Sequence, residues 1–191
     1  MDGLDHVLEE LGALGIGQQI GGAGQQPLLK LDIRGFDLTK LGSSSVFTDL
    51  MSEIYGSGEL KCLTYFGIVN CNLQGYVGNL VIENEKDSFF QPLLASCPRL
   101  LELNICYNEL SVEYLKLALM DLLSGFHPAL FESKHLLINY LPHRAAHSAS
   151  KWPLQSQNYD MLQTLLSEYS SIKAHRIDRV RDRITIWPTV P

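Results

Sequence analysis

The residues with the most suggestive chemical spacing are two histidines in a polar stretch late in the chain. His143 and His147 lie four residues apart, a separation at which two imidazoles on one helical turn can hold a metal ion. The Glu that follows the first His in the H-E-x-x-H motif is missing here. Prolines and serines also break any helical periodicity over residues 142–157. We therefore interpret this pair as part of a polar surface loop and predict no metal site.

A second stretch, residues 15–24, contains five glycines and invites comparison with phosphate-binding loops. A dinucleotide fingerprint needs a strand before the glycines and a helix after them, and a Walker loop ends in Lys followed by Ser or Thr. Neither context is present, so we interpret the stretch as a flexible Gly/Gln-rich linker and predict no cofactor.

Nucleophilic catalysis finds equally little support in the sequence. No serine stands in a G-x-S-x-G elbow. No C-x-x-C pair is formed by the four cysteines, which are Cys62, Cys71, Cys97 and Cys106. Their pattern is typical of small apolar residues in a reducing compartment rather than of disulfides or zinc ligands. We expect a protein without enzymatic activity.

The most basic stretch is residues 175–183, where four arginines and a histidine could attract phosphate. Asp178 and Asp182 interrupt it, and the whole chain carries a net charge of −6. Nucleic acid and anionic membrane surfaces are therefore unfavourable partners, and we interpret the stretch as a solvated face with local ion pairs.

Length and composition describe an ordinary globular chain. It has 191 residues, of which 46% are hydrophobic and 19% charged, enough to bury a sizeable core in one domain or a short solenoid. No basic segment followed by an apolar run opens the sequence, and no apolar run approaches the ~20 residues of a spanning helix. We expect a cytoplasmic or nuclear location without membrane contact.

The clearest repeated pattern is a short strand signal with two apolar anchors. Residues 100–110 read L-x-x-L-x-L-x-x-N-x-L, and residues 28–38 and 63–73 repeat that frame with Phe36 and Cys71 in place of Asn108. The anchors are Leu31/Ile33, Phe66/Ile68 and Leu103/Ile105, with weaker copies at Leu136/Ile138 and Ile184/Ile186. The spacings between successive copies are 35, 37, 33 and 48 residues.

This pattern resembles the leucine-rich repeat (LRR) family, in the long-repeat, ribonuclease-inhibitor-like variety. The resemblance implies an α/β fold: a short right-handed solenoid with parallel strands on its concave side and helices on its convex side. It also implies that the amide of Asn108 bonds loop backbone between adjacent units. Residues 1–27 would form an N-terminal cap, with a helix at residues 4–14, followed by a linker. Residues 28–191 would form an LRR-like domain of about five irregular repeats.

Periodicity and caps predict the elements of these repeats. Strands are expected at 29–34, 64–69, 101–106, 135–139 and 183–187, all parallel, the last being an edge strand because of Pro188. Helices are expected from the serines at 43–45 to Ile54, in two pieces between Leu80 and Leu94, after Ser111, and from Asn158 to Ile172.

Alternation along the strands then defines the inner sheet face, which we predict to be the binding surface. Its candidate residues mix charge, amide and aromatic groups: Lys30, Asp32, Arg34, Tyr65, Glu102, Asn104, His135, Asn139, Arg183 and Trp187. Such a mixture is typical of protein interfaces, where Tyr, Trp and Arg anchor the partner.

We therefore predict a non-enzymatic module that binds another protein through its concave sheet. By the family resemblance alone, it would belong to a regulator or to a substrate receptor of a cullin-type ubiquitin ligase. Two alternatives remain. The first is an α/β enzyme with its site at the carboxyl ends of the strands, near 36–40, 71–74, 107–109 and 140–143. The second is weak RNA binding through the C-terminal arginines.

Overall fold

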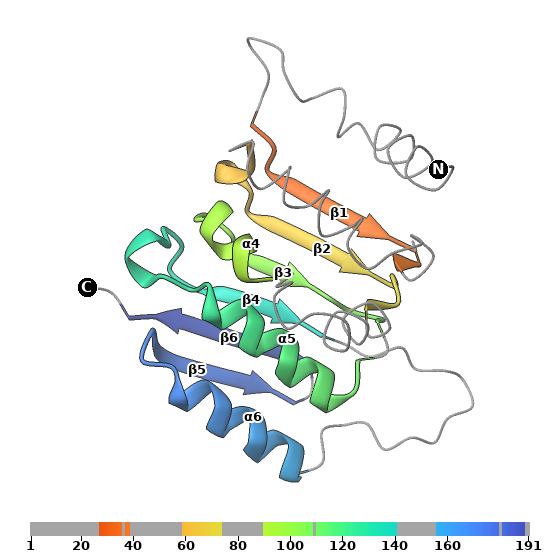
Figure 1. Ribbon diagram of the computed structural model, residues 1–191, viewed down its shortest axis with the longest axis vertical. Coiled ribbons are helices and arrows are strands. Elements are labelled where there is room, and N and C mark those ends of the chain that lie inside the picture. The colour runs from red at the N-terminus through yellow and green to blue at the C-terminus, as the bar shows by residue number, and fades with distance from the viewer. Residues whose placement is uncertain are drawn as a thin grey trace.

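A computed structural model describes residues 27–35, 37–38, 59–73, 90–108, 110–140, 156–179 and 181–189. These residues form one six-stranded sheet with the order β1-β2-β3-β4-β6-β5. The strands are β1 (Lys30–Arg34), β2 (Tyr65–Val69), β3 (Glu102–Asn104), β4 (Leu136–Asn139), β5 (Ile172–Asp178) and β6 (Arg183–Pro188). Figure 1 shows the first four side by side in chain order, followed by the last two in reverse order.

The apolar anchors predicted from the repeat all lie in the core. Leu31, Phe66, Leu103, Ile138 and Ile184 occupy one continuous row across the sheet, since each is paired with the next. Every residue of the five anchor pairs is at most 5% exposed. The alternation of strand side chains was therefore predicted in the correct register.

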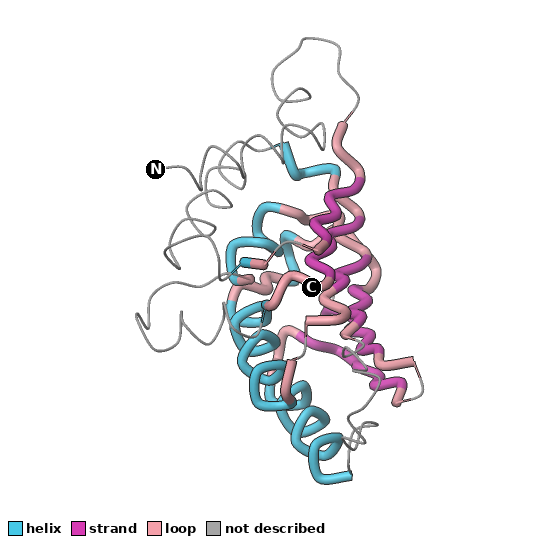
Figure 2. Tube along the Cα trace, turned by 90° about the vertical axis from the view of Figure 1, so that its right-hand side faces the viewer, coloured by secondary structure: helices cyan, strands magenta, loops and turns pink. Residues whose placement is uncertain are grey.

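Three described helices cover the face on which these anchors lie. They are α4 (Gln91–Ser96), α5 (Val112–Ser124) and α6 (Ser156–Glu168). Figure 2 shows the helices as one layer, packed on one side of the layer of strands. Short 3-10 turns, η2 (Glu59–Cys62) and η3 (Pro128–Leu130), precede β2 and β4. The described residues therefore form two layers, and we call the sheet surface that no described helix covers the open face.

Helix α5 illustrates why these segments are helical. Ser111 caps it as predicted, accepting a hydrogen bond from the backbone N–H of Tyr114. Glu113 in the first turn has a pKa lowered by hydrogen bonds to backbone and to Ser111, which suits the positive end of the helix. Leu115, Leu119 and Leu122 bury one stripe of the helix against the sheet. The backbone N–H of Phe90, which precedes α4, donates to Asp121 Oδ2 of α5 at 2.6 Å and ties the two helices together.

The prediction of a uniformly parallel sheet is wrong at its C-terminal end. Strands β1 to β4 are parallel, but β6 pairs antiparallel with β4, and β5 pairs antiparallel with β6. The reason is a strand that the sequence prediction lacks. It places Ile172 in the helix and interprets residues 175–183 as a solvated charged face, whereas α6 ends at Glu168 and residues 172–178 are extended. The short β5–β6 turn then forces a hairpin, because two antiparallel strands can be joined tightly and two parallel strands cannot.

This correction also changes the predicted edge. Strand β6 lies between β4 and β5, so β5 is the outer strand on that side of the sheet. Pro188 is tolerated because it is the last residue of β6, where few ladder bonds remain to be made. The fifth predicted unit is therefore not a copy of the first four.

Several predicted segments fall outside the described residues. They are the helix at 4–14, the Gly/Gln-rich linker, the helix at 43–54, the N-terminal part of the helical window at 80–94, and most of the loop at 142–157. The predicted strand at 101–106 is shorter than expected, at three residues, although the N–H of Ile105 still donates to the carbonyl of Asn139 in the next unit.

Candidate functional site

The ten predicted surface residues lie along the same side of the sheet. The pairing register aligns Lys30 with Tyr65 and Tyr65 with Glu102, and aligns Asn104 with Asn139 and Asn139 with Arg183. His135 precedes β4, and Trp187 lies near the end of β6. Strand β5 adds three residues to this face that sequence reasoning missed: Ala174, Arg176 and Asp178, which pair with Trp187, Thr185 and Arg183.

The β1 end of the open face has its charges compensated. Asp32 Oδ2 lies 2.8 Å from Nη2 of Arg34 and 3.4 Å from Nζ of Lys30. Its hydrogen bond and charge raise the pKa of Arg34 above its ordinary value. Lys30 also lies over the ring of Tyr65, with Nζ 4.4 Å from the ring centroid. Exposed pairs of this kind contribute little stability, but they fix where the charges sit.

The centre of the open face is a pre-ordered polar network. The amide of Asn104 donates to the hydroxyl of Tyr65 at 3.0 Å, and the amide of Asn139 donates to Glu102 Oε1 at 2.6 Å. Asn104 Oδ1 also accepts from the backbone N–H of Cys106 at 3.1 Å. Each bond crosses from one strand to a neighbour or to the following loop, so the side chains are held before any partner arrives.

Gly67 explains how this network fits together. A Cβ built on Gly67 would lie 2.4 Å from Asp32 Oδ1 and 2.9 Å from the hydroxyl of Tyr65. The missing side chain leaves room for the Tyr65 ring to lie against the sheet and reach Asn104. Any larger residue at position 67 would displace Tyr65 or Asp32.

The opposite end of the open face, on β5 and β6, is different. Within the described parts of the chain, the guanidinium groups of Arg176 and Arg183 make no ion pair or hydrogen bond. Arg176 is exposed and Arg183 half-buried. Trp187 is 36% exposed and stands opposite Ala174, whose small side chain covers little of the indole ring. Within the described residues, this end therefore presents an aromatic surface and two guanidinium groups without an ion pair, with Asp178 opposite Arg183.

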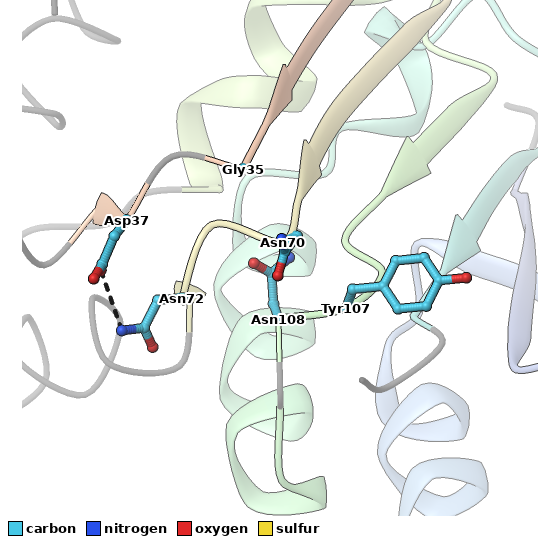
Figure 3. Close-up of a pocket in the computed structure, with 6 residues that line it drawn as sticks. All are labelled: Gly35, Asp37, Asn70, Asn72, Tyr107 and Asn108. Atoms are coloured by element: carbon cyan, nitrogen blue, oxygen red, sulfur yellow. Dashed lines mark hydrogen bonds between the residues drawn. The ribbon is translucent and has the colours of Figure 1, made fainter. Parts of the chain in front are cut away.

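The carboxyl ends of β1, β2 and β3 form a separate hollow of about 280 Å³ (Figure 3). Gly35, Asp37, Asn70, Asn72, Tyr107 and Asn108 line it. Gly35, Asn70 and Tyr107 each lie four residues after the first apolar anchor of their unit, and all three have left-handed backbone, with φ between 57° and 70°. Equivalent positions of the three units thus share one conformation although their residue types differ.

Asn108 binds the units together at this hollow, in the structural role that the family resemblance implies. Its Oδ1 accepts from the N–H groups of Cys71 and Leu73 at 2.8 and 3.3 Å. Its amide nitrogen lies 2.6 Å from the carbonyl oxygen of Ile68, 3.0 Å from that of Ile105 and 3.3 Å from that of Cys106. The side chain is 1% exposed, so its polar atoms are committed to the fold.

The hollow is also where the enzyme alternative would place a site. Among the described residues that line it, Asp37 is the single carboxylate and no histidine or cysteine is present. Asp37 accepts from the amide of Asn72 at 3.2 Å, and the ring of Tyr107 points away from both (Figure 3). His143, which belongs to the range 140–143 named for that alternative, lies outside the described residues. The described lining offers hydrogen bonds but no nucleophile paired with a base.

The cysteines and histidines add no reactive centre to the described ranges. Burial raises the pKa of the Cys97 thiol to about 12, so it stays protonated at neutral pH and is a poor nucleophile. All four cysteines are free thiols. In the part of the chain that the structure describes, no three His, Cys, Asp or Glu side chains gather as metal ligands. The pair at 143 and 147 lies outside it.

Comparisons with protein-family models, curated proteins and solved structures find no match to this chain. The resemblance to leucine-rich repeats therefore depends on this chain's own residues. Among the described residues, no helix has the length and apolar character needed to cross a membrane.

Proposed function

We propose that this chain is a non-enzymatic, LRR-like domain that binds another protein through the open face of its sheet. The observation that carries the proposal is the asymmetry between the two sheet faces. One face buries the apolar anchors under helices, while the other presents an ordered array of amide, charged and aromatic side chains. Side chains fixed before association lose little conformational entropy on binding, which favours a rigid interface.

Three features of the parallel part support an LRR-like arrangement. The apolar anchors recur every 33–37 residues, the residues after β1, β2 and β3 share a left-handed conformation, and Asn108 bonds across two units. Each unit buries its anchors only beside its neighbours, as stacked repeats do. The family resemblance extends the proposal to a regulator or substrate receptor in the ubiquitin pathway. Recovery of cullin-type ligase subunits with the chain would support that extension.

The proposal is tested by comparing partners recovered from cell lysate by the wild-type chain and by a Tyr65→Ala/Trp187→Ala variant. Both residues lie on the open face, and each supplies aromatic contact area of the type that anchors interfaces. We expect the variant to lose the specific partner. The matched control is Leu117→Ala/Met120→Ala, which removes exposed apolar side chains from α5 on the other side of the sheet.

Two outcomes would count against the proposal. If the Tyr65/Trp187 variant recovers the same proteins as the wild type, the open face is not the interface. If the α5 control loses the partner and the open-face variant keeps it, the helical layer is the binding surface. Thermal melts of all forms separate lost contacts from lost folding.

A further inference from the structure

The two ends of the open face compensate their positive charges differently. At the β1 end, Asp32 neutralises Arg34 and Lys30 directly, with contacts of 2.8 and 3.4 Å. At the other end, Arg176 and Arg183 make no ion pair within the described residues. Asp178 stands opposite Arg183, but its Oδ1 accepts from the backbone N–H of Arg181 at 3.1 Å in the hairpin turn.

The charge of the hairpin contrasts with that of the chain. Residues 172–183 contain five Lys or Arg and two Asp, a net charge of +3. The remaining residues contain ten Lys or Arg and nineteen Asp or Glu, a net charge of −9. A positive patch on an otherwise acidic chain attracts anionic groups.

The two free arginines and the tryptophan form a compact strip. Arg176 pairs with Thr185, and Arg183 lies two residues before Thr185 on the same strand, so the arginines are diagonal neighbours on one face. Trp187 lies two residues beyond Thr185, about 7 Å along the strand at the usual rise. Thr185 lies between Arg183 and Trp187 on β6, and Leu137 of β4 is paired with Thr185 on the side away from β5, so both neighbouring positions are uncharged.

We propose that this strip, on β4, β6 and β5, binds an acidic segment of a partner protein. Carboxylates of the segment lie against Arg176 and Arg183, whose planar guanidinium groups can bind a carboxylate through two parallel hydrogen bonds. An apolar side chain next to the acidic residues packs on Trp187 above Ala174. This inference rests on the proposed function and names the chemistry of its partner.

The surroundings favour an acidic protein segment over RNA. Trp187 is the single exposed aromatic side chain of this strip, whereas strands of RNA are usually bound by several stacking platforms. Glu102 lies on the same face and Asp178 borders the arginines, and both would repel an extended phosphate backbone. A short segment with two or three carboxylates avoids those groups.

The test is a titration with labelled peptides of defined charge. The acidic peptide carries Asp and Glu on either side of a Leu-Phe pair, the basic peptide carries Lys at the same positions, and oligouridylate represents RNA. We expect the full chain to bind the acidic peptide, and Arg176→Glu/Arg183→Glu to weaken that binding at least about tenfold. Trp187→Ala should weaken it about tenfold as well, because exposed aromatic anchors dominate such contacts.

A matched control makes the same change in net charge elsewhere. Lys61→Glu/Lys116→Glu reverses two lysines on η2 and α5, outside the open face, and should change the affinity less than about threefold. Arg176→Lys/Arg183→Lys keeps the charge but loses the bidentate geometry, so its affinity should fall between those of the wild type and the Glu variant. Because it changes no charge, it also serves as the test if the Glu variant fails to fold.

Several results would overturn the inference. They are equal weakening by the two lysine reversals, tighter binding of the basic peptide, preferential binding of oligouridylate, or no binding of the acidic peptide. Self-association of the chain that the arginine reversals abolish would instead assign the strip to a second copy. A partner recovered through Tyr65 and Trp187 but unaffected by the arginine reversals would refute this inference and leave the proposed function standing.

Discussion

The parallel and antiparallel parts of this sheet use the same strand pattern and are held together by different means. In the parallel part, β1, β2 and β3 are joined at their carboxyl ends by loop backbone bonds, such as Gly35 N–H to Val69 and Asn70 N–H to Cys106, and by the buried amide of Asn108. In the antiparallel part, the hairpin is attached to α6 through side chains. His175 Nε2 lies 2.5 Å from Gln163 Oε1, and the amide of Gln163 donates to the hydroxyl of Tyr159 at 2.7 Å.

Side-chain alternation and strand direction are therefore separate properties of a strand. Alternation places Leu103 and Ile184 on the helical side whichever way the strand runs. The direction of a strand is set by the segment that connects it to its neighbour. A short turn can join only antiparallel strands, whereas a crossover through a helix can join parallel ones. Four predictions test this contrast, ordered from the largest expected effect to the smallest.

The largest effect is expected from a charge in the shared apolar row. Leu103→Asp would bury a carboxylate at a position 1% exposed, in the middle of the sheet, and should cost more than about 4 kcal/mol or unfold the chain. Chemical denaturation monitored by circular dichroism measures the loss. Leu101→Asp, at a residue 41% exposed, is the control and should cost much less. Unchanged melting of the Leu103 variant would mean that the register of β3 is wrong.

The next effect isolates the parallel part. Asn108→Ala removes one acceptor and one donor group that together make five hydrogen bonds to backbone, leaving buried N–H and C=O groups unpaired. We expect a loss of about 2–4 kcal/mol and faster hydrogen exchange at Cys71 and Leu73 before any change in β5. Asn72→Gly, which removes an exposed hydrogen bond to Asp37 and leaves the left-handed backbone (φ of 53°) unstrained, should cost under about 0.5 kcal/mol. Equal protection in both variants would contradict a localised role for Asn108.

A smaller effect concerns the left-handed residues that end the parallel strands. Asn70 has φ of 57°, so a β-branched residue there is strained while glycine is not. Asn70→Val should cost about 1–2 kcal/mol, and Asn70→Gly should be close to neutral. Equilibrium urea unfolding of the two variants measures the difference. If the two variants have the same free energy of unfolding, the shared left-handed conformation of residues 35, 70 and 107 does not stabilise the packing of adjacent units.

The smallest effect belongs to the hairpin and depends on pH. Burial beneath α6 lowers the pKa of His175 below its ordinary value of 6.5. His175 therefore binds a proton more weakly in the folded state than in the unfolded state. Its contribution to the free energy of unfolding is fully present above pH 6.5 and is lost as the pH falls through the lowered pKa. Denaturation curves at neutral and mildly acidic pH should show this loss in the wild type. The loss should be smaller in His175→Gln, and an identical pH dependence would exclude His175 as its source.

Much of the parallel part could be predicted from sequence because its signals are local. Paired apolar anchors at Leu31/Ile33 and Phe66/Ile68 fix which side faces the core, and Ser111 marks the start of α5. The hairpin could not be predicted in the same way. Ile172 continues the apolar stripe of α6, and the charged residues after it hide the alternation of β5. The odd spacing of Ile172 and Ile177 also does not fit strict alternation, because the register of β5 shifts between Ile172 and Ala174.

The candidate surface was predictable residue by residue but not as a set of interactions. Alternation gave the strand positions of Glu102 and Asn139, while their 2.6 Å hydrogen bond depends on which strands become neighbours. That Arg176 and Arg183 make no ion pair within the described residues could not be foreseen either. Whether a cation finds a partner depends on Asp178, whose Oδ1 accepts a hydrogen bond from the turn backbone at the N–H of Arg181.

The reversed strand has a consequence for how this architecture could be lengthened. A new unit of some three dozen residues could be inserted between β3 and β4, because both neighbours run in the same direction and would accept another parallel strand. No such unit could be inserted between β4 and β6 without breaking their antiparallel register. Growth by duplication, in nature or by design, is therefore restricted to the N-terminal side of Leu136, and the hairpin acts as a fixed stop.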